Sequence, residues 1–150
     1  MSPAEFFKDI VAPNVDALGN DVGDLRHAVN AILSLDALAG IIHADLHSRG
    51  QETNDDAAFR ERFAEQHLEY GIVRDAAFAL KHGELRHKKP RLVQRADQVT
   101  SYSGAFGEAV WDRSAFDTEA VIWIEANNPD HSRRADQITR AVLDIFRGMV

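Results

Sequence analysis

Apolar side chains recur at helical spacing through two long stretches of the chain, and each stretch predicts an amphipathic helix. The first helix starts near Asp16 or Asp21 and continues to about His47, with apolar residues over much of its circumference. The second spans about Ala57 to Leu85. Two helices of this length joined by a modest loop predict a long antiparallel helical hairpin.

A shorter helix precedes the hairpin and carries a start signal. Ser2 caps the first turn, Pro3 suits the first helical position, and Glu5 reaches back to close a capping box. Because proline lacks the backbone N–H that a helix interior needs, we expect this helix to end at about Val11, before Pro13.

After Pro90 the helical spacing is replaced by short extended segments. Segments 91–99, 107–114 and 119–126 are bounded by turn residues, and the last is rich in Val, Ile and Trp. They predict a three-stranded antiparallel sheet in which the strand at 119–126 is the most buried.

The last part of the chain returns to helical spacing. Asn128 and Pro129 are expected to open a closing helix with one apolar stripe. The expected fold class is therefore α+β, with an N-terminal helix, the hairpin, the sheet and a C-terminal helix. With 150 residues the chain fits a single domain, residues 1–150, with a helical part at 1–88 and the sheet plus closing helix at 90–150.

The composition of the chain argues against cysteine chemistry, a membrane span and a nucleic-acid coat protein. There are no cysteines, which excludes disulfides, thiolate metal sites and Cys nucleophiles. No apolar run approaches the ~18 residues of a membrane span, and the N-terminus lacks a basic segment followed by an apolar one. We therefore expect a cytoplasmic protein with no membrane partner. A net charge of −7 argues against a protein that coats nucleic acid with its whole surface.

Positive charge is nevertheless concentrated in residues 81–95, which we call the basic segment. It holds six Lys or Arg residues against one acid, Glu84. Such a density of positive charge attracts phosphate groups, so the expected ligand is RNA or another anion. The candidate nucleic-acid-binding residues are Lys81, Lys88, Lys89 and Arg91.

Two charged pairs occupy neighbouring lines of the second long helix. Arg74 and Lys81 are seven residues apart, as are Asp75 and His82, so each pair lies within about 20° of one line. One interpretation is a solvated face whose Lys and His favour the negative end of the helix dipole. The other is a catalytic site in which Arg74 binds phosphate and His82 transfers a proton near neutral pH.

Asp36 is flanked on both sides by apolar residues of the first long helix. An unpaired buried carboxylate is costly, so we expect a basic partner on the facing helix, with Arg74 the first candidate. Charge pairs among Asp36, Arg74 and Asp75 would then be structural and would fix the register of the hairpin.

His43 and His47 are four residues apart on one helix and are weak candidate metal ligands. Asp24 and His27, three residues apart, form a further pair. No clear third ligand in register on another helix accompanies His43 and His47, so surface histidines near a helix end are the other interpretation. The chain also has no Gly-rich phosphate loop, nucleophile elbow or dinucleotide fingerprint, and we predict no cofactor.

Two stretches together resemble a group of small uncharacterised bacterial and phage-associated proteins. The first is LRHAVNAILSLD at 25–36, with Arg26, His27 and Asn30, and the second is VRDAAFALKHGEL at 73–85. Proteins of the group have an Arg-His helix with a following Asn, and then a helix with Arg-Asp and, five residues on, Lys-His. The resemblance covers the helical part of the chain and implies no established activity.

More remotely, the chain is similar to the HEPN superfamily (higher eukaryotes and prokaryotes nucleotide-binding domains). Many members are dimeric ribonucleases or nucleic-acid-binding proteins of toxin and phage-defence systems. The family motif has Arg, a polar residue, and His after four to six intervening residues, whereas seven residues separate Arg74 from His82 here. The resemblance implies that His82 acts as acid or base at the ribose 2′-OH, that Arg74 stabilises phosphate charge, and that a homodimer joins two such pairs.

Three functions therefore stay open. The expected one is a HEPN-like nucleic-acid-associated protein, with metal-independent RNA cleavage as its implied activity. The alternatives are a non-enzymatic protein-interaction module with structural charge pairs, and a metal-binding helical bundle.

Overall fold

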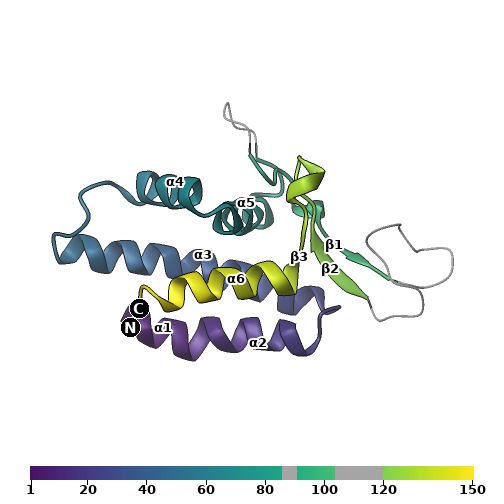
Figure 1. Ribbon diagram of the computed structural model, residues 1–150, viewed down its shortest axis with the longest axis horizontal. Coiled ribbons are helices and arrows are strands. Elements are labelled where there is room, and N and C mark those ends of the chain that lie inside the picture. The colour runs from purple at the N-terminus through teal and green to yellow at the C-terminus, as the bar shows by residue number, and fades with distance from the viewer. Residues whose placement is uncertain (86–90, 104–119) are drawn as a thin grey trace.

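The computed structural model describes residues 1–85, 91–103 and 120–150 and has the α+β fold expected from the sequence (Figure 1). Helix α3 (Leu25–Ser48) runs through the middle of the molecule. Helices α4 (Asp56–Gln66) and α5 (Leu68–His82) return along one side of it. Helices α2 (Ala12–Asn20) and α6 (Ala135–Arg147) also pack against it. The sheet lies at one end of the helices, so the predicted antiparallel hairpin, sheet and closing helix are confirmed.

The N-terminal helix does not end before Pro13, and that expectation is wrong. A continuous helical run contains α1 (Pro3–Phe6), a π-helical turn η1 (Phe7–Val11) and α2 (Ala12–Asn20). In the π-helical turn the Ala12 amide donates to the Phe7 carbonyl, five residues back. Pro13 has no backbone N–H to donate to the preceding turn, and the wider turn leaves room for its ring against that turn.

Capping residues set two of the helix starts. At α1 the predicted capping box is confirmed, since Glu5 N–H donates to Ser2 Oγ at 3.2 Å and Ser2 N–H to Glu5 Oε2 at 2.8 Å. At α3 the Asp24 carboxylate accepts from the amides of Arg26 and His27, at 2.7 and 3.1 Å. This cap follows a short break at residues 21–24 and fixes the start of α3 at Leu25. The start is later than the expected one near Asp16 or Asp21.

Helix α3 forms the centre of the core. Among the described residues it is the one helix that is long and apolar enough to cross a membrane by length and composition. This was not expected from the sequence, which has no uninterrupted apolar run of that length. Its inward residues pack against α2, α5 and α6, so burial within the fold accounts for this composition. The fully buried apolar residues of α3 are Ala28, Ala31, Ile32, Leu35, Leu38 and Ala39.

The second long helix predicted from the sequence is broken at His67, whose backbone is extended (φ −134°, ψ 97°). The break brings aromatic rings from both halves together, with Phe63 and Tyr70 centroids 4.8 Å apart and both against Phe146 of α6. Close packing accounts for the glycine at position 71 of α5. A Cβ on Gly71 would lie 3.1 Å from the Leu92 side chain and 3.5 Å from Cβ of Ala64 in α4.

The sheet has the order β1-β2-β3, with β1 (Val99–Tyr102), β2 (Val121–Ile124) and β3 (Arg133–Arg134) all antiparallel. The three-stranded antiparallel architecture is confirmed, and Ile122 and Ile124 of β2 are fully buried. The strand assignments differ from the sequence expectation. Segment 91–99 contributes only its last residue to a strand, and segment 107–114 lies outside the described residues.

The third strand comes from a part of the chain that we expected to be helical. Asn128 caps only a short 3-10 turn, η3 (Pro129–His131), by accepting from the Asp130 amide at 3.1 Å. Ser132 Oγ then accepts from the Ala126 amide at 3.0 Å, which draws the chain back alongside β2. Helix α6 (Ala135–Arg147) therefore starts later than predicted, and its apolar stripe faces the core.

Candidate functional site

Asp36 lies at the centre of a buried ion-pair arrangement. Its carboxylate is 1% exposed, and Arg60 of α4 and Lys81 of α5 donate to it at 2.5 and 2.7 Å. Arg60 also donates to the Asp36 carbonyl oxygen at 2.8 Å and to Asp56 at 2.8 Å. The expectation that Asp36 is buried with basic partners is confirmed. The expectation that Arg74 is one of these partners is wrong, because they are Arg60 and Lys81.

Sequence reasoning missed Arg60, although one signal was present. Gly40 lies on α3 one turn after Asp36, and a Cβ there would be 2.5 Å from Nη2 of Arg60. The glycine therefore makes room for the guanidinium inside the hairpin. Burial is the largest single influence on the pKa of Arg60 and lowers it, but the acidic groups around it, Asp36 first, together outweigh burial and raise the pKa, so the guanidinium stays charged.

Arg74 is also buried, but in a different set of contacts. Its Nη1 donates to Glu61 Oε2 at 2.9 Å and to the Arg60 carbonyl at 3.3 Å. Its Nε and Nη2 lie 3.0 and 2.9 Å from Asp75 Oδ1. Each of its three nitrogens already has an acceptor, and the side chain is only 6% exposed. Arg74 therefore presents no free guanidinium edge for a phosphate.

Asp75 links this arrangement to the end of the basic segment. Its Oδ2 accepts from the Leu92 amide at 2.8 Å, and its Oδ1 lies 3.3 Å from Nη1 of Arg91. The same Arg91 nitrogen lies 3.6 Å from Glu61. Asp75 is 1% exposed, so a fully buried acid holds the backbone of the basic segment at Leu92.

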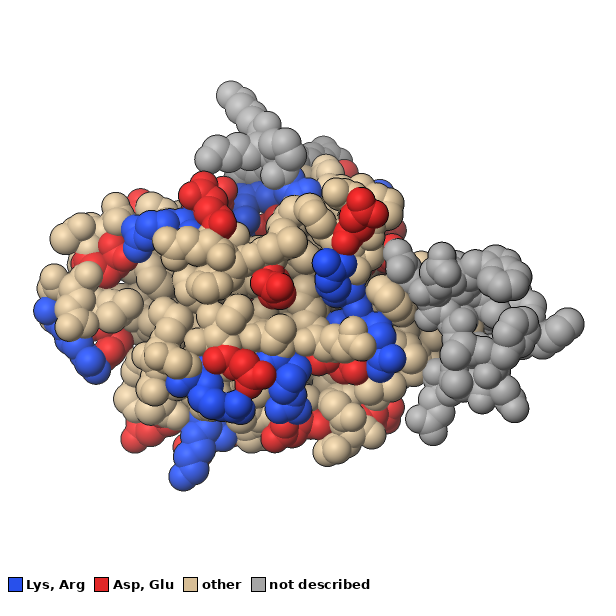
Figure 2. Space-filling view, in the orientation of Figure 1, with Lys and Arg blue, Asp and Glu red and all other residues tan. Residues whose placement is uncertain are grey.

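These contacts form one closed network, which we call the charge cluster. It balances four acids against four bases, and the Arg74–Arg60 contact joins its two halves. On the face seen in Figure 2, acidic and basic side chains are likewise interspersed, without a large patch of one sign. The members of the charge cluster are Asp36, Asp56, Arg60, Glu61, Arg74, Asp75, Lys81 and Arg91.

Tyr70 lies in the core close to the charge cluster and is 0% exposed. Burial raises the pKa of its phenol, and Arg60 opposes this effect without overcoming it. The phenol is therefore neutral at physiological pH and separated from solvent. It is a packing residue, in ring contact with Phe63 and Phe146.

The structure does not bring Arg74 and His82 together within one chain. His82 is the last residue of α5 and is exposed, whereas Arg74 is enclosed in the charge cluster. Eight residues of helix separate them by about 12 Å along the axis and about 80° around it. A shared catalytic role for these two residues therefore stays a prediction that needs a second copy of the chain.

Two backbone hydrogen bonds join residues 83–85 to residues 94–96, on either side of the part of the basic segment that lies outside the described residues. The Leu85 amide donates to Gln94 O at 2.8 Å, and the Ala96 amide donates to Gly83 O at 2.9 Å. Of the four nucleic-acid-binding candidates, Lys81 and Arg91 are held by the charge cluster, with side chains 43% and 14% exposed. Lys88 and Lys89 lie outside the described residues.

The two histidines proposed as metal ligands instead hold a loop. His43 Nε2 lies 2.9 Å from the Asn54 carbonyl, and His47 Nδ1 lies 3.0 Å from the Glu52 carbonyl. Their rings stack with centroids 5.8 Å apart. Within the described ranges they belong to no group of three or more ligand-type side chains, so a structural role explains both.

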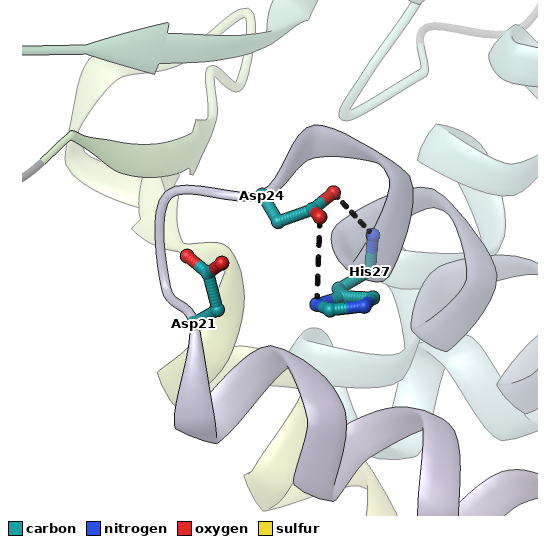
Figure 3. Close-up of side chains that lie close together, drawn as sticks. All are labelled: Asp21, Asp24 and His27. Carbon is teal, nitrogen blue, oxygen red and sulfur yellow. Dashed lines mark hydrogen bonds and ion pairs between the residues drawn. The ribbon is translucent and has the colours of Figure 1, made fainter.

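A different group of ligand-type side chains lies where α2 meets α3. Asp21, Asp24 and His27 bring one ligand atom each to within 4.8 Å of one another (Figure 3). The sequence pointed to Asp24 and His27 as a pair, but Asp21 was missed because its approach depends on the break between the two helices.

Comparison with family models, curated proteins and solved structures finds no match to this chain. The HEPN resemblance therefore stays a prediction, and any function has to be argued from the residues themselves.

Proposed function

We propose that this chain is a HEPN-like RNA-binding protein that holds RNA through the basic segment and does not use Arg74 to bind phosphate. In this proposal Arg74 and Asp75 position the basic segment, and Lys88 and Lys89, which do not belong to the charge cluster, contact the RNA backbone.

Charge density is the first support for the proposal. The whole chain carries a net charge of −7, yet residues 81–95 hold six basic side chains and one acidic side chain. A compact basic segment on an acidic protein attracts a polyanion to one place and repels it elsewhere.

The observation that carries the proposal is the use of a fully buried carboxylate to hold that segment. Asp75 accepts from the Leu92 amide at 2.8 Å and pairs with Arg91, while Arg74 compensates its charge. Asn127 adds a second attachment through the Arg91 carbonyl, at 2.8 Å. Burying an acid is costly, so a buried acid that fixes one end of the basic segment indicates that its position matters.

The proposal separates binding from cleavage. Arg74 has acceptors for all three nitrogens, and His82 lies about two turns further along α5, on another face. Neither residue of the expected catalytic pair is therefore ready to act with the other in a single chain.

The test is fluorescence anisotropy with a labelled single-stranded RNA at several salt concentrations. Replacing both Lys88 and Lys89 by Glu should weaken binding strongly. The slope of log K against log salt should fall by about 1.4, or about 0.7 for each lost phosphate contact.

The matched control is Lys8→Glu with Arg49→Glu, which changes the net charge by the same amount outside the basic segment. Both control residues are exposed. Equal loss of binding in the two double variants would contradict the proposal, because binding would then follow net charge alone. RNA should also stay intact in EDTA. Cutting that disappears in His82→Ala would overturn the non-catalytic part and restore the ribonuclease prediction.

The second candidate is a non-enzymatic protein-interaction module. The observation in its favour is the balance of the charge cluster, which uses Asp36, Arg74 and Asp75 to hold the fold together. Parent protein that binds neither RNA nor DNA at low salt would favour this candidate over the first.

A further inference from the structure

The junction between α2 and α3 carries a group of side chains that the proposed function does not use. Asp21 follows the last residue of α2, Asp24 caps α3, and His27 lies in its first turn. We call these three residues the junction group. Figure 3 shows the two carboxylates and the imidazole gathered on one side of the loop.

The two oxygens of Asp24 have different surroundings. Oδ1 accepts from the amides of Arg26 and His27, which is its capping role. Oδ2 faces Nδ1 of His27 across 3.7 Å, which is longer than a hydrogen bond. Two ligands that each lie about 2.1 Å from one ion are about 3.6 Å apart when they subtend about 120°. The observed gap therefore fits an ion between the two atoms.

A second observation concerns the hydrogen bonding of the His27 ring. Its Nδ1 atom is shielded from solvent and makes no hydrogen bond within the described part of the chain. A shielded polar atom without a hydrogen bond is uncommon and calls for an explanation such as an ion, since the contact of this nitrogen with Asp24 Oδ2 is 3.7 Å long. The side chain as a whole is 27% exposed, so an ion could still reach it from solvent.

One neighbour must move for His27 to act as a ligand through Nδ1. Its other nitrogen, Nε2, lies 3.5 Å from Nη2 of Arg26, and coordination by Nδ1 requires the ring proton to be on Nε2. Arg26 also contacts Asp24 Oδ2 at 3.3 Å. Because its side chain is 75% exposed, Arg26 can turn into solvent without disturbing the core.

The junction has room for an ion and its water ligands. A surface cavity of about 580 Å³ opens beside the junction group, lined by Asn20, Asp21, Gly23, Asp24 and Ala120. The positive end of the α3 dipole disfavours a cation here, and the two negatively charged carboxylates offset that effect.

We propose that the junction group binds a divalent transition-metal ion of the zinc class, with Asp21, Asp24 and His27 as its protein ligands and water in the remaining positions. One imidazole nitrogen with two carboxylates suits Zn²⁺, whereas Mg²⁺ and Ca²⁺ prefer oxygen ligands alone. The ion joins the end of α2 to the start of α3 and is independent of RNA binding.

Isothermal titration calorimetry with Zn²⁺ on the metal-free full-length chain tests the site. The expected result is one Zn²⁺ per chain, with affinity reduced at least tenfold in His27→Ala and in Asp21→Asn. Thermal unfolding should shift upward with Zn²⁺ in the parent and much less in these variants.

Asp24→Asn separates metal binding from helix capping. Asparagine caps a helix about as well as aspartate, so the metal-free melting temperature should stay near that of the parent while Zn²⁺ affinity falls at least tenfold. The control is His82→Ala, a surface histidine outside the group, which should bind Zn²⁺ as the parent does. No heat of binding, equal binding in all four variants, or equal affinity for Mg²⁺ would each overturn the proposal.

Discussion

The charge cluster and the junction group both gather ionisable side chains, but they differ in how completely these side chains are hydrogen-bonded. In the charge cluster every acid has a basic partner within 3.3 Å, and the arrangement is closed to solvent at Asp36 and Asp75. In the junction group two acids and a histidine face one another, and the histidine nitrogen has no hydrogen bond among the described residues. Charged side chains therefore support the fold where each one is fully hydrogen-bonded, and they form a candidate ligand site where a shielded polar atom, here His27 Nδ1, makes no hydrogen bond within the described residues.

The largest expected effect is from Asp36→Ala, which tests whether the charge cluster is structural. The change leaves the guanidinium of Arg60, only 12% exposed, and the ammonium of Lys81 without their carboxylate. Unfolding free energy from urea denaturation should fall by about 3 to 5 kcal/mol. The control Asp97→Ala removes an exposed partner of Arg95 and should cost less than about 1 kcal/mol. Similar losses in both variants would contradict the comparison.

Asp75→Asn should have the next largest effect, because asparagine keeps an acceptor for the Leu92 amide but removes the charge that Arg74 and Arg91 share. A loss of about 2 to 3 kcal/mol is expected from urea denaturation. Hydrogen exchange at the Leu92 amide should accelerate more than at amides in the middle of α3. Unchanged exchange at Leu92 would show that Asp75 does not hold the basic segment.

Gly40→Ala tests the space that the Arg60 guanidinium needs. The new methyl group would lie 2.5 Å from Nη2 of Arg60, and Arg60 cannot easily move while Asp36 and Asp56 hold it. Overpacking of about 1 to 3 kcal/mol should exceed the gain of about 1 kcal/mol in helix propensity, so the protein becomes less stable. Gly148→Ala, where the nearest atom is 3.5 Å away, is the control. A more stable Gly40→Ala protein would mean that the guanidinium relaxes freely.

The smallest effect concerns Glu52, an acid that accepts hydrogen bonds from two backbone amides and from the side chains of Asn54 and Arg62. The Asn54 amide and then the Arg62 side chain lower the pKa of Glu52 from 4.5 to about 2. Because the folded protein keeps this carboxylate charged, its contribution to stability is complete above pH 4.5 and is lost as the pH falls toward 2. In Glu52→Gln the melting temperature should therefore vary less across that interval than in the parent. Identical pH profiles would contradict the assignment.

Local signals in the sequence predicted much of the fold. The Ser2–Glu5 capping box, the long apolar helix α3 and the buried strand β2 each follow from short patterns, and all three are present. The features that were missed depend on distant parts of the chain. The break at His67 places Phe63 and Tyr70 against Phe146, and no capping signal at His67 announces it.

The candidate site was predicted in part for the same reason. The sequence required a partner for Asp36, because apolar neighbours surround it, but it could not supply the orientation of α4 relative to α5. That orientation depends on the break at His67, and it presents Arg60 to Asp36 while turning Arg74 toward Glu61. The correct inference was burial with a basic partner, and the identity of the partner required the structure.

The attachment at Leu92 has a consequence for the way the protein unfolds. Its amide donates to Asp75 on α5, and its carbonyl oxygen accepts from the Asn127 amide, 2.8 Å away, just after β2. One residue thus connects the helical layer to the segment that follows the central strand. Separating the helical layer from that segment breaks either the Leu92–Asp75 bond or the Asn127–Leu92 bond, so we expect a single cooperative transition. Helical circular dichroism and tryptophan fluorescence should then give the same midpoint in urea.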